Sequence, residues 1–293
     1  MRLLLILMGL LTLAPEIARA QSPLSIPPGQ LVREVVYNEL HDHSTHGYWR
    51  YSIEKHVQQE TRLEEQIETA AGPVTRLIRT NGHPIDAAKQ KSEQARLDNL
   101  LTSPGDQARL RKEYDDNEKR IGRILALLPD AFLYDYVGEE NGCHHLRFHP
   151  NPDYPAHSIE ARIFHAMSGE MWINSRYKHL VRLDGTVQTN VDFGFGILGR
   201  LYKGGWFRLQ RTQVSSTDWK TERLEVHMIG RALLFKTIAR ETSEIRGGFA
   251  PVPPDITLAK AMEMLHPLSI SSTGSASEPT TSTEGAKSFL NKH

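Results

Sequence analysis

Apolar and polar residues alternate through short segments between residues 169 and 244. This alternation is typical of antiparallel strands with one buried face, because successive side chains point to opposite sides of a sheet. In the segment from residue 179 to 187, the pattern predicts that Val181, Leu183 and Val187 share one face, with charged residues on the other. The same alternation recurs further along this block, which therefore predicts a multi-stranded antiparallel sheet.

Other segments with this pattern lie on both sides of a central helical stretch. The first run covers residues 48–79. The second run begins at Phe132 and includes residues 159–167 as a strand, followed by a turn at Ser168 and Gly169. Together with the block described above, these segments predict a sheet of roughly ten or more strands.

Four segments have the composition or the apolar spacing of helices. They are residues 31–40, residues 86–101 with Asp86 as N-cap, residues 106–128 capped by Asp106 and stopped by Pro129, and residues 257–265 capped by Asp255. The two central helices are highly charged, so we expect water to cover most of their outer faces. Strands in two runs with helices between them predict an α+β fold with a mostly antiparallel sheet.

Residues 1–20 have the features of a cleaved export signal. Arg2 precedes an apolar run, Leu3–Leu13, that is too short to cross a bilayer, and an Ala-x-Ala cleavage motif ends at Ala20. The residue directly after the cleavage site is Gln21 and not a cysteine, so we do not expect the mature chain to be lipidated. These features predict a periplasmic or otherwise exported protein.

The remainder of the chain divides by composition. Residues 21–47 are predicted to form a leader with a short helix, and residues 48–268 a single sheet domain with a helical insert at residues 86–128. Residues 269–293 are rich in serine, threonine and glycine, and we expect them to be disordered, because such a composition cannot bury enough apolar surface.

The charge balance argues against two classes of partner. The chain has 35 basic and 35 acidic residues, and removal of the signal peptide changes this balance little. No basic excess favours nucleic acid, and no polybasic segment favours an anionic membrane surface. Cys143 is the single cysteine, so no intramolecular disulfide can form, and we interpret its thiol as buried and inert.

Residues 192–206 interrupt the strand pattern, because glycines there alternate with large apolar residues. The segment has neither the pattern of a helix nor that of a stiff strand, and glycine lowers the cost of a hinge motion. Beside a sheet, such a segment is expected to form a mobile apolar lip. The sequence thus favours a surface that holds something apolar.

Several stretches together resemble a known family: residues 76–85, residues 160–183 with the strand opening Gly169-Glu-Met-Trp-Ile-Asn174, residues 192–206 and residues 230–235. The sequence resembles the outer-membrane lipoprotein-sorting (LolA/LolB-like) superfamily, in particular its larger exported members, over residues 48–265. The resemblance implies a strongly curved antiparallel sheet, an incomplete barrel, with helices packed on its concave side. The chain is longer than the well-studied carriers of this superfamily, and its helical insert is larger and more charged.

The same resemblance implies a function. It implies a non-enzymatic carrier, without a cofactor, that holds a lipid or an acylated protein in a hydrophobic trough and makes transient contact with the inner or outer membrane. Burial of an acyl chain contributes about 0.8 kcal/mol per CH₂, so a chain of about sixteen carbons gains on the order of ten kcal/mol before ordering costs. The candidate ligand-binding residues are Trp172, Val181, Leu183, Phe193, Phe195, Leu198, Tyr202, Trp206, Phe207, Leu209, Val226 and Phe235.

Two alternatives to a carrier stay open, and so does the oligomeric state. The first is a structural protein of the cell envelope that uses the same sheet to dock a protein partner. The second is a metal-dependent enzyme built on one of two histidine-rich groups, although a solvated turn and strand-edge histidines explain these groups better. The groups are Asp42 with His41, His43 and His46, and Cys143 with His144, His145 and His149.

A third pattern is weak. Gly194, Gly196 and Gly199 form a G-x-G-x-x-G spacing. A dinucleotide-binding loop of this kind opens a helix, whereas residues 200–205 have no helical pattern. The sequence therefore does not favour a nucleotide-binding function.

Overall fold

The computed structural model describes residues 25–41, 47–57, 59–193, 199–232 and 236–265. Several predictions fall outside these ranges. They concern the signal peptide at residues 1–20, the disordered tail at residues 269–293, and the residues Asp42, His43, His46, Phe195, Leu198 and Phe235.

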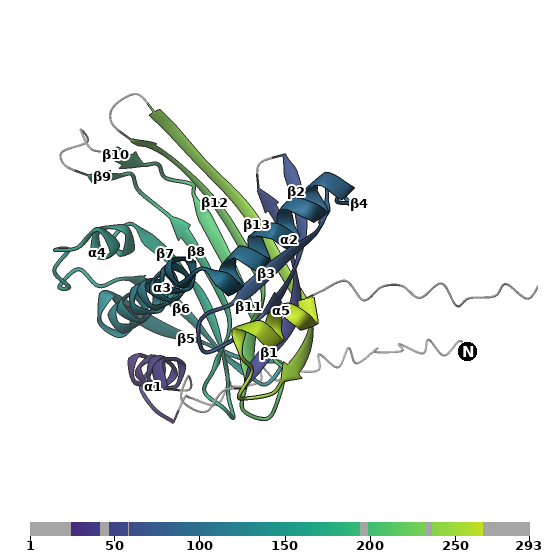
Figure 1. Ribbon diagram of the computed structural model, residues 1–293. Coiled ribbons are helices and arrows are strands. Elements are labelled where there is room, and N and C mark those ends of the chain that lie inside the picture. The colour runs from purple at the N-terminus through teal and green to yellow at the C-terminus, as the bar shows by residue number, and fades with distance from the viewer. Residues whose placement is uncertain (1–24, 42–46, 58, 194–198, 233–235, 266–293) are drawn as a thin grey trace, which may run out of the picture.

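Thirteen strands of the described chain form one antiparallel sheet (Figure 1). The strand order is β4-β3-β2-β1-β13-β12-β11-β8-β7-β6-β5, and the short β9 and β10 extend the sheet along the far part of β12. The strands are β1 (Tyr48–Val57), β2 (Glu60–Ile67), β3 (Val74–Thr80), β4 (His83–Pro84), β5 (Phe132–Glu140), β6 (Cys143–Pro150), β7 (Met167–Asn174), β8 (Leu180–Val187), β9 (Val191–Phe193), β10 (Gly199–Leu201), β11 (Trp206–Gln213), β12 (Trp219–Ala232) and β13 (Lys236–Val252). The sheet curves but does not close, because β4 and β5 do not pair with each other.

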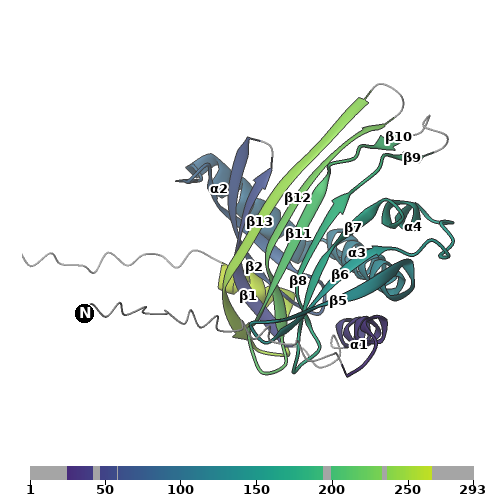
Figure 2. The same ribbon diagram turned by 180° about the vertical axis from the view of Figure 1, so that it is seen from behind.

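Five helices in the described ranges cover this sheet: α1 (Pro28–His41), α2 (Ala87–Thr102), α3 (Pro104–Ala131), α4 (Ile159–Phe164) and α5 (Leu258–Leu265). Helices α1, α3 and α4 pack over the concave face of β5 to β8, whereas α2 and α5 pack over β2 and β3. Figures 1 and 2 show the two sides of this arrangement, with the sheet seen from behind in Figure 2. The predicted α+β fold with a strongly curved, open antiparallel sheet is confirmed.

The largest apolar core lies between α1, α3, α4 and the concave face of the sheet. Helix α1 contributes a buried stripe of Leu31, Val32, Val35 and Val36, as the spacing of its apolar residues predicts. The sheet contributes fully buried side chains from β6 and β7, among them Leu146, Met171 and Ile173. Because each of these elements is apolar on one side only, the core forms where their apolar sides meet.

If Asp106 were the N-cap, α3 would begin at residue 107. The helix instead begins at Pro104, three residues earlier. Ser103 is the N-cap, because its hydroxyl accepts a hydrogen bond from the Asp106 N–H at 3.2 Å, and Pro104 occupies the first turn. A proline is well suited to that position because it lacks an N–H that would have no partner there. The prediction for α2 is confirmed: Asp86 is its N-cap and accepts the Lys89 N–H at 2.8 Å.

Pro129 does not stop α3, which continues to Ala131. The carbonyl oxygens near the end of the helix find donors elsewhere in the chain. The Tyr134 hydroxyl donates to the Leu128 carbonyl at 2.7 Å, and the Asn151 side chain donates to the Asp130 carbonyl at 2.8 Å. These donors lie outside the helix, so its own sequence could not predict where it ends.

The prediction of a strand at residues 159–167 is wrong. Residues Ile159–Phe164 form α4, and the Ser158 hydroxyl caps it by accepting the Ala161 N–H at 3.0 Å. A segment this short fits both periodicities, and the capping serine decides in favour of the helix. The predicted turn at Ser168 and Gly169 is also wrong, since both residues lie within β7.

Two further predictions need correction. Thr257, rather than Asp255, caps α5, because its hydroxyl accepts the Lys260 N–H at 3.2 Å. Residues 192–206 contain regular structure that the glycine-rich pattern does not predict: β9 and β10 pair with each other, and β10 pairs with β12. This hairpin prolongs the sheet past the irregular connection at residues 202–205.

An open sheet has free edges, which can pair with the edges of other molecules. The short β4 covers only one end of the free edge of β3. Further along this edge, two side chains of α2 form hydrogen bonds with the backbone of β3. The Glu93 carboxylate accepts the Leu77 N–H at 3.0 Å, and the Arg96 guanidinium donates to the Thr75 carbonyl. Glu93 and Arg96 also bond each other, which holds both in place. At the other edge, a bulge at residues 136–138 of β5 interrupts the regular strand.

We predict that Glu93→Ala lowers the free energy of unfolding by roughly 1–2 kcal/mol, because the Leu77 N–H loses a charged acceptor. The same variant should also form more soluble oligomers, since it frees part of the β3 edge. Glu93→Gln is the matched control, because it keeps an acceptor oxygen for Leu77. Chemical denaturation and light scattering measure the two effects. Equal stability and equal oligomer content in both variants would show that Glu93 does not protect the edge.

Candidate functional site

Two glycines shape the concave face of the sheet. Gly169 on β7 lies opposite Gly185 on β8. A side chain at Gly169 would overlap the Asp184 carbonyl oxygen of β8 and would come within 2.7 Å of the Phe148 ring, and one at Gly185 would overlap the Phe207 ring. Both positions therefore need glycine, Gly169 because of the backbone of β8 and the Phe148 ring, and Gly185 because of the Phe207 ring.

These rings form part of a small apolar cavity between the sheet, α3 and α4. The cavity has a volume of about 20 Å³, roughly the room of one water molecule. The one hydroxyl group among its walls belongs to Tyr134 and donates to the Leu128 carbonyl at 2.7 Å, and burial raises the pKa of this tyrosine. The walls are Leu128, Phe132, Tyr134, Phe148, Phe164, Met167, Met171, Leu183 and Phe207, and we call this site the apolar cavity.

Half-buried apolar side chains continue the wall of the apolar cavity toward the far end of the sheet. Val226 lies opposite Phe207 in the pairing of β11 with β12, so the two share a face. We call the continuation the apolar strip; it consists of Phe193, Leu201, Leu209, Val226 and Met228.

The structure thus brings together five of the candidate residues. Leu183 and Phe207 line the apolar cavity, while Phe193, Leu209 and Val226 belong to the apolar strip. The sequence analysis did not identify the residues of other elements that line the apolar cavity, such as Phe132, Phe148 and Phe164. Their alternation with polar neighbours marks them as apolar strand or helix positions but does not say which cavity they line.

The prediction of Trp172 and Val181 as ligand-binding residues needs correction, because both lie on the convex face of the sheet. In the pairing of β7 with β8, Trp172 lies opposite Arg182 and Ile173 lies opposite Leu180, so Val181 is an extra residue, a bulge. The bulge places Val181 on the side opposite Leu183, against the alternation predicted from sequence. Trp172 stacks on His145 at 4.4 Å between ring centroids, and the Arg182 guanidinium lies 4.5 Å from its ring.

Trp206 and Tyr202 also lie away from the apolar cavity. Trp206 precedes Phe207 on β11 and therefore points to the convex face, where the residue is 38% exposed and its ring stacks with His227 at 6.0 Å between centroids. Tyr202 belongs to the connection between β10 and β11, where its N–H donates to the Ile229 carbonyl at 2.9 Å.

The histidine-rich groups have ordinary protein partners. His145 Nε2 lies 3.5 Å from Glu170, and His149 Nδ1 lies 3.5 Å from Asp135. His41 stacks on the Tyr37 ring at 4.0 Å between centroids. Within the described ranges, no three histidine, cysteine, aspartate or glutamate side chains are placed to share a metal ion. Cys143 is half-buried, and burial together with nearby acidic side chains raises the pKa of its thiol.

A buried ion pair that the sequence analysis missed joins α1 to the sheet. The Glu39 carboxylate pairs with the Arg211 guanidinium of β11 and lies 3.3 Å from His179 Nδ1 and from the Leu180 N–H. Burial by itself raises the pKa of Glu39, but the His179 hydrogen bond and the charge and hydrogen bond of Arg211 outweigh it and lower the pKa to about 2. The signal in the sequence is the position of Glu39, seven residues after Val32 on the apolar stripe of α1.

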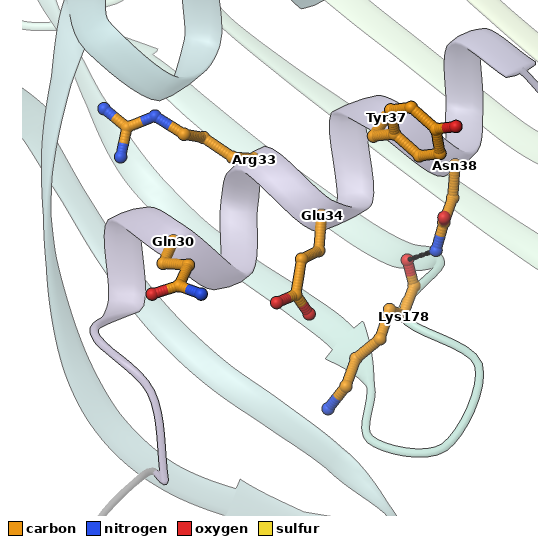
Figure 3. A pocket seen from close by; sticks show the side chains of 6 residues that line it. All are labelled: Gln30, Arg33, Glu34, Tyr37, Asn38 and Lys178. Carbon is orange, nitrogen blue, oxygen red and sulfur yellow. Dashed lines mark hydrogen bonds between the residues drawn. The ribbon is translucent and has the colours of Figure 1, made fainter.

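Polar side chains predominate on the outer side of α1. Figure 3 shows Gln30, Arg33, Glu34, Tyr37 and Asn38 on this helix, with Lys178 from the turn before β8 beside them. The Asn38 side chain donates to the Lys178 carbonyl at 3.2 Å. Arg33 points away from Glu34 and Lys178, toward Asp130 at the end of α3, whose carboxylate it reaches at 2.8 Å.

Comparison with known proteins adds no assignment: neither a protein-family model nor a curated protein matches this chain. Among the helices in the described ranges, none combines the length and apolar content of a membrane span.

We predict that Gly185→Ala destabilises the protein by about 1–3 kcal/mol, because the new methyl group overlaps the Phe207 ring. Removing that ring in the double variant with Phe207→Ala should make the glycine substitution nearly neutral. A double-mutant cycle from chemical denaturation measures this coupling. Additive effects of the two substitutions would show that the ring does not depend on Gly185.

The lowered pKa of Glu39 predicts that the free energy of unfolding depends on pH. Its pKa in the folded protein, about 2, lies below the ordinary value of 4.5, so its contribution is fully present above pH 4.5. The contribution is then lost as the pH falls toward 2. At neutral pH, we expect Glu39→Gln to lower the free energy of unfolding by on the order of 3 kcal/mol.

The matched control is Glu34→Gln, on the outer side of the same helix. Denaturation curves between pH 7 and pH 2 should show the difference between the wild type and Glu39→Gln shrinking below pH 4.5. A difference that stays constant over this range would contradict the assigned ion pair.

Proposed function

We propose that this protein binds the acyl chain of a lipid or of an acylated protein on the concave face of its sheet, and carries it as a non-enzymatic periplasmic binding protein. The observation that supports this best is the continuity of the apolar cavity with the half-exposed apolar strip. Exposed apolar surface of this kind favours an apolar partner, because covering it removes that surface from water.

The chemistry of the apolar cavity supports the same proposal. The Tyr134 hydroxyl already has an acceptor within the protein, so an apolar guest leaves no polar group without a partner. Each methylene that is transferred from water into such a site contributes about 0.8 kcal/mol. Affinity can therefore arise from chain length alone, without a hydrogen-bonding motif.

The small volume of the apolar cavity implies that a guest must displace some of the surrounding side chains. Met167 and Met171 in its wall are suited to this, because methionine is unbranched and adapts its shape to its neighbours. Leu183 and Phe207 are only half-buried and lie where the apolar cavity meets the apolar strip. We propose that an acyl chain passes between these two side chains where it meets the apolar strip.

The test compares two residues on β8 that lie on opposite faces because of the bulge. Delipidated wild-type protein should bind a fluorescent long-chain fatty acid. Leu183→Gln should weaken this binding at least about tenfold, because it introduces a polar group into an apolar wall. Val181→Gln is the matched control on the convex face and should bind like the wild type.

Circular dichroism verifies that both variants are folded. Native mass spectrometry of the protein as isolated provides an independent readout, since a carrier should retain an acyl ligand. Absence of binding by the folded wild type, or equal binding by both variants, would count against the proposed function.

A further inference from the structure

A polar hollow lies directly beside the apolar cavity, and Phe132 and Tyr134 belong to the walls of both. The hollow has a volume of about 420 Å³ and lies where the start of α1, the end of α3, β5 and the loop after β6 meet. Its charged side chains are Arg33, Asp130 and Asp153. A polar site and an apolar site that share two aromatic walls match the two parts of an amphiphile.

The charges of the polar hollow select among headgroups. Arg33 bonds Asp130 at 2.8 Å, and both side chains are 60% exposed. This pair uses one of the five N–H donors of the guanidinium, so Arg33 can still bind an anionic group. The Asp153 carboxylate has no ion-pair or hydrogen-bond partner among the described residues, while its N–H donates to the Asn151 side chain at 3.1 Å. The hollow thus offers one cation with free donors and one free carboxylate.

The dimensions agree with a chain that runs from this hollow across the sheet. Strands β5, β6, β7, β8 and β11 are successive neighbours, and neighbouring strands lie about 4.8 Å apart, so the distance from β5 to β11 is roughly 19 Å. One lipid leaflet contributes about half of the ~30 Å hydrocarbon core of a bilayer. A chain of about 15 Å whose headgroup lies beside β5 therefore crosses about three strand spacings and ends near Leu183 on β8, one strand short of Phe207 on β11.

From this juxtaposition, the geometry points to a headgroup site for a zwitterionic phospholipid in the polar hollow, with Arg33 binding the phosphate and Asp153 binding the ammonium group. The inference rests on the proposed function, because the acyl chain of the same molecule occupies the apolar cavity. A phosphoethanolamine headgroup carries both charges, whereas a phosphoglycerol headgroup carries the phosphate alone. The site should therefore prefer the first.

The experiment uses full-length protein and three competitors that displace a fluorescent fatty acid: lysophosphatidylethanolamine, lysophosphatidylglycerol and an uncharged alcohol, all with the same chain. The wild type should bind the ethanolamine lipid about threefold to fivefold more tightly than the glycerol lipid, as expected for one solvent-exposed ion pair. Asp153→Asn should abolish this preference and leave the affinity for the alcohol unchanged.

Two further variants complete the test. Arg33→Gln should weaken both lysolipids by a similar factor but not the alcohol. Asp135→Asn removes an exposed carboxylate on β5 that lies outside the hollow, and it should keep the wild-type preference.

The two proposals can fail separately. If the alcohol binds but the wild type does not distinguish the two lysolipids, or if Asp153→Asn keeps the preference, the headgroup site is wrong and the acyl-binding function stands. If none of the three competitors and no fatty acid binds, the proposed function itself is wrong and the headgroup site fails with it.

Discussion

An antiparallel sheet that curves without closing must bury its concave face against something other than itself. In this protein, helices from three separate parts of the chain lie over β5 to β8: α1 before the sheet, α3 between its two runs of strands, and α4 after β6. They cover the concave face unevenly. Side chains beneath α1 and α3 are fully buried, whereas those of the apolar strip stay half-exposed. The proposed binding site is the boundary between these two regions.

The position of the helices depends on a few polar contacts whose partners lie far apart in the sequence. Glu39 fixes the end of α1 to β11 and to the turn before β8. Arg33 fixes the start of the same helix to the end of α3. The charge of Glu39 is buried and therefore stable only when it is paired, so its contacts with Arg211 and His179 favour one placement of α1 over a sliding range. The Arg33–Asp130 pair is exposed and contributes little to this placement. The walls of the apolar cavity and of the polar hollow follow from this placement.

Much of the fold could be predicted because its signals are local. Alternation identified the strand regions on both sides of the helical insert, and Asp86 correctly marked the start of α2. Predictions failed where two local signals compete. Ser103 and Asp106 are both good caps, and residues 159–164 fit either a helix or a strand. For the candidate site, alternation placed Val181, Leu183 and Val187 on one face, but it could not anticipate the bulge that turns Val181 away.

The sequence by itself determined the class of fold and the apolar character of one face of the sheet, because both depend on the spacing of residues within single elements. The tertiary structure alone decided which apolar residues meet in one cavity, that Gly169 and Gly185 lie under aromatic rings, and that Glu39 has a buried partner. These features depend on the register between strands and on contacts between distant segments. A single extra residue in one strand changes which face its neighbours occupy, and no periodicity within that strand reports it.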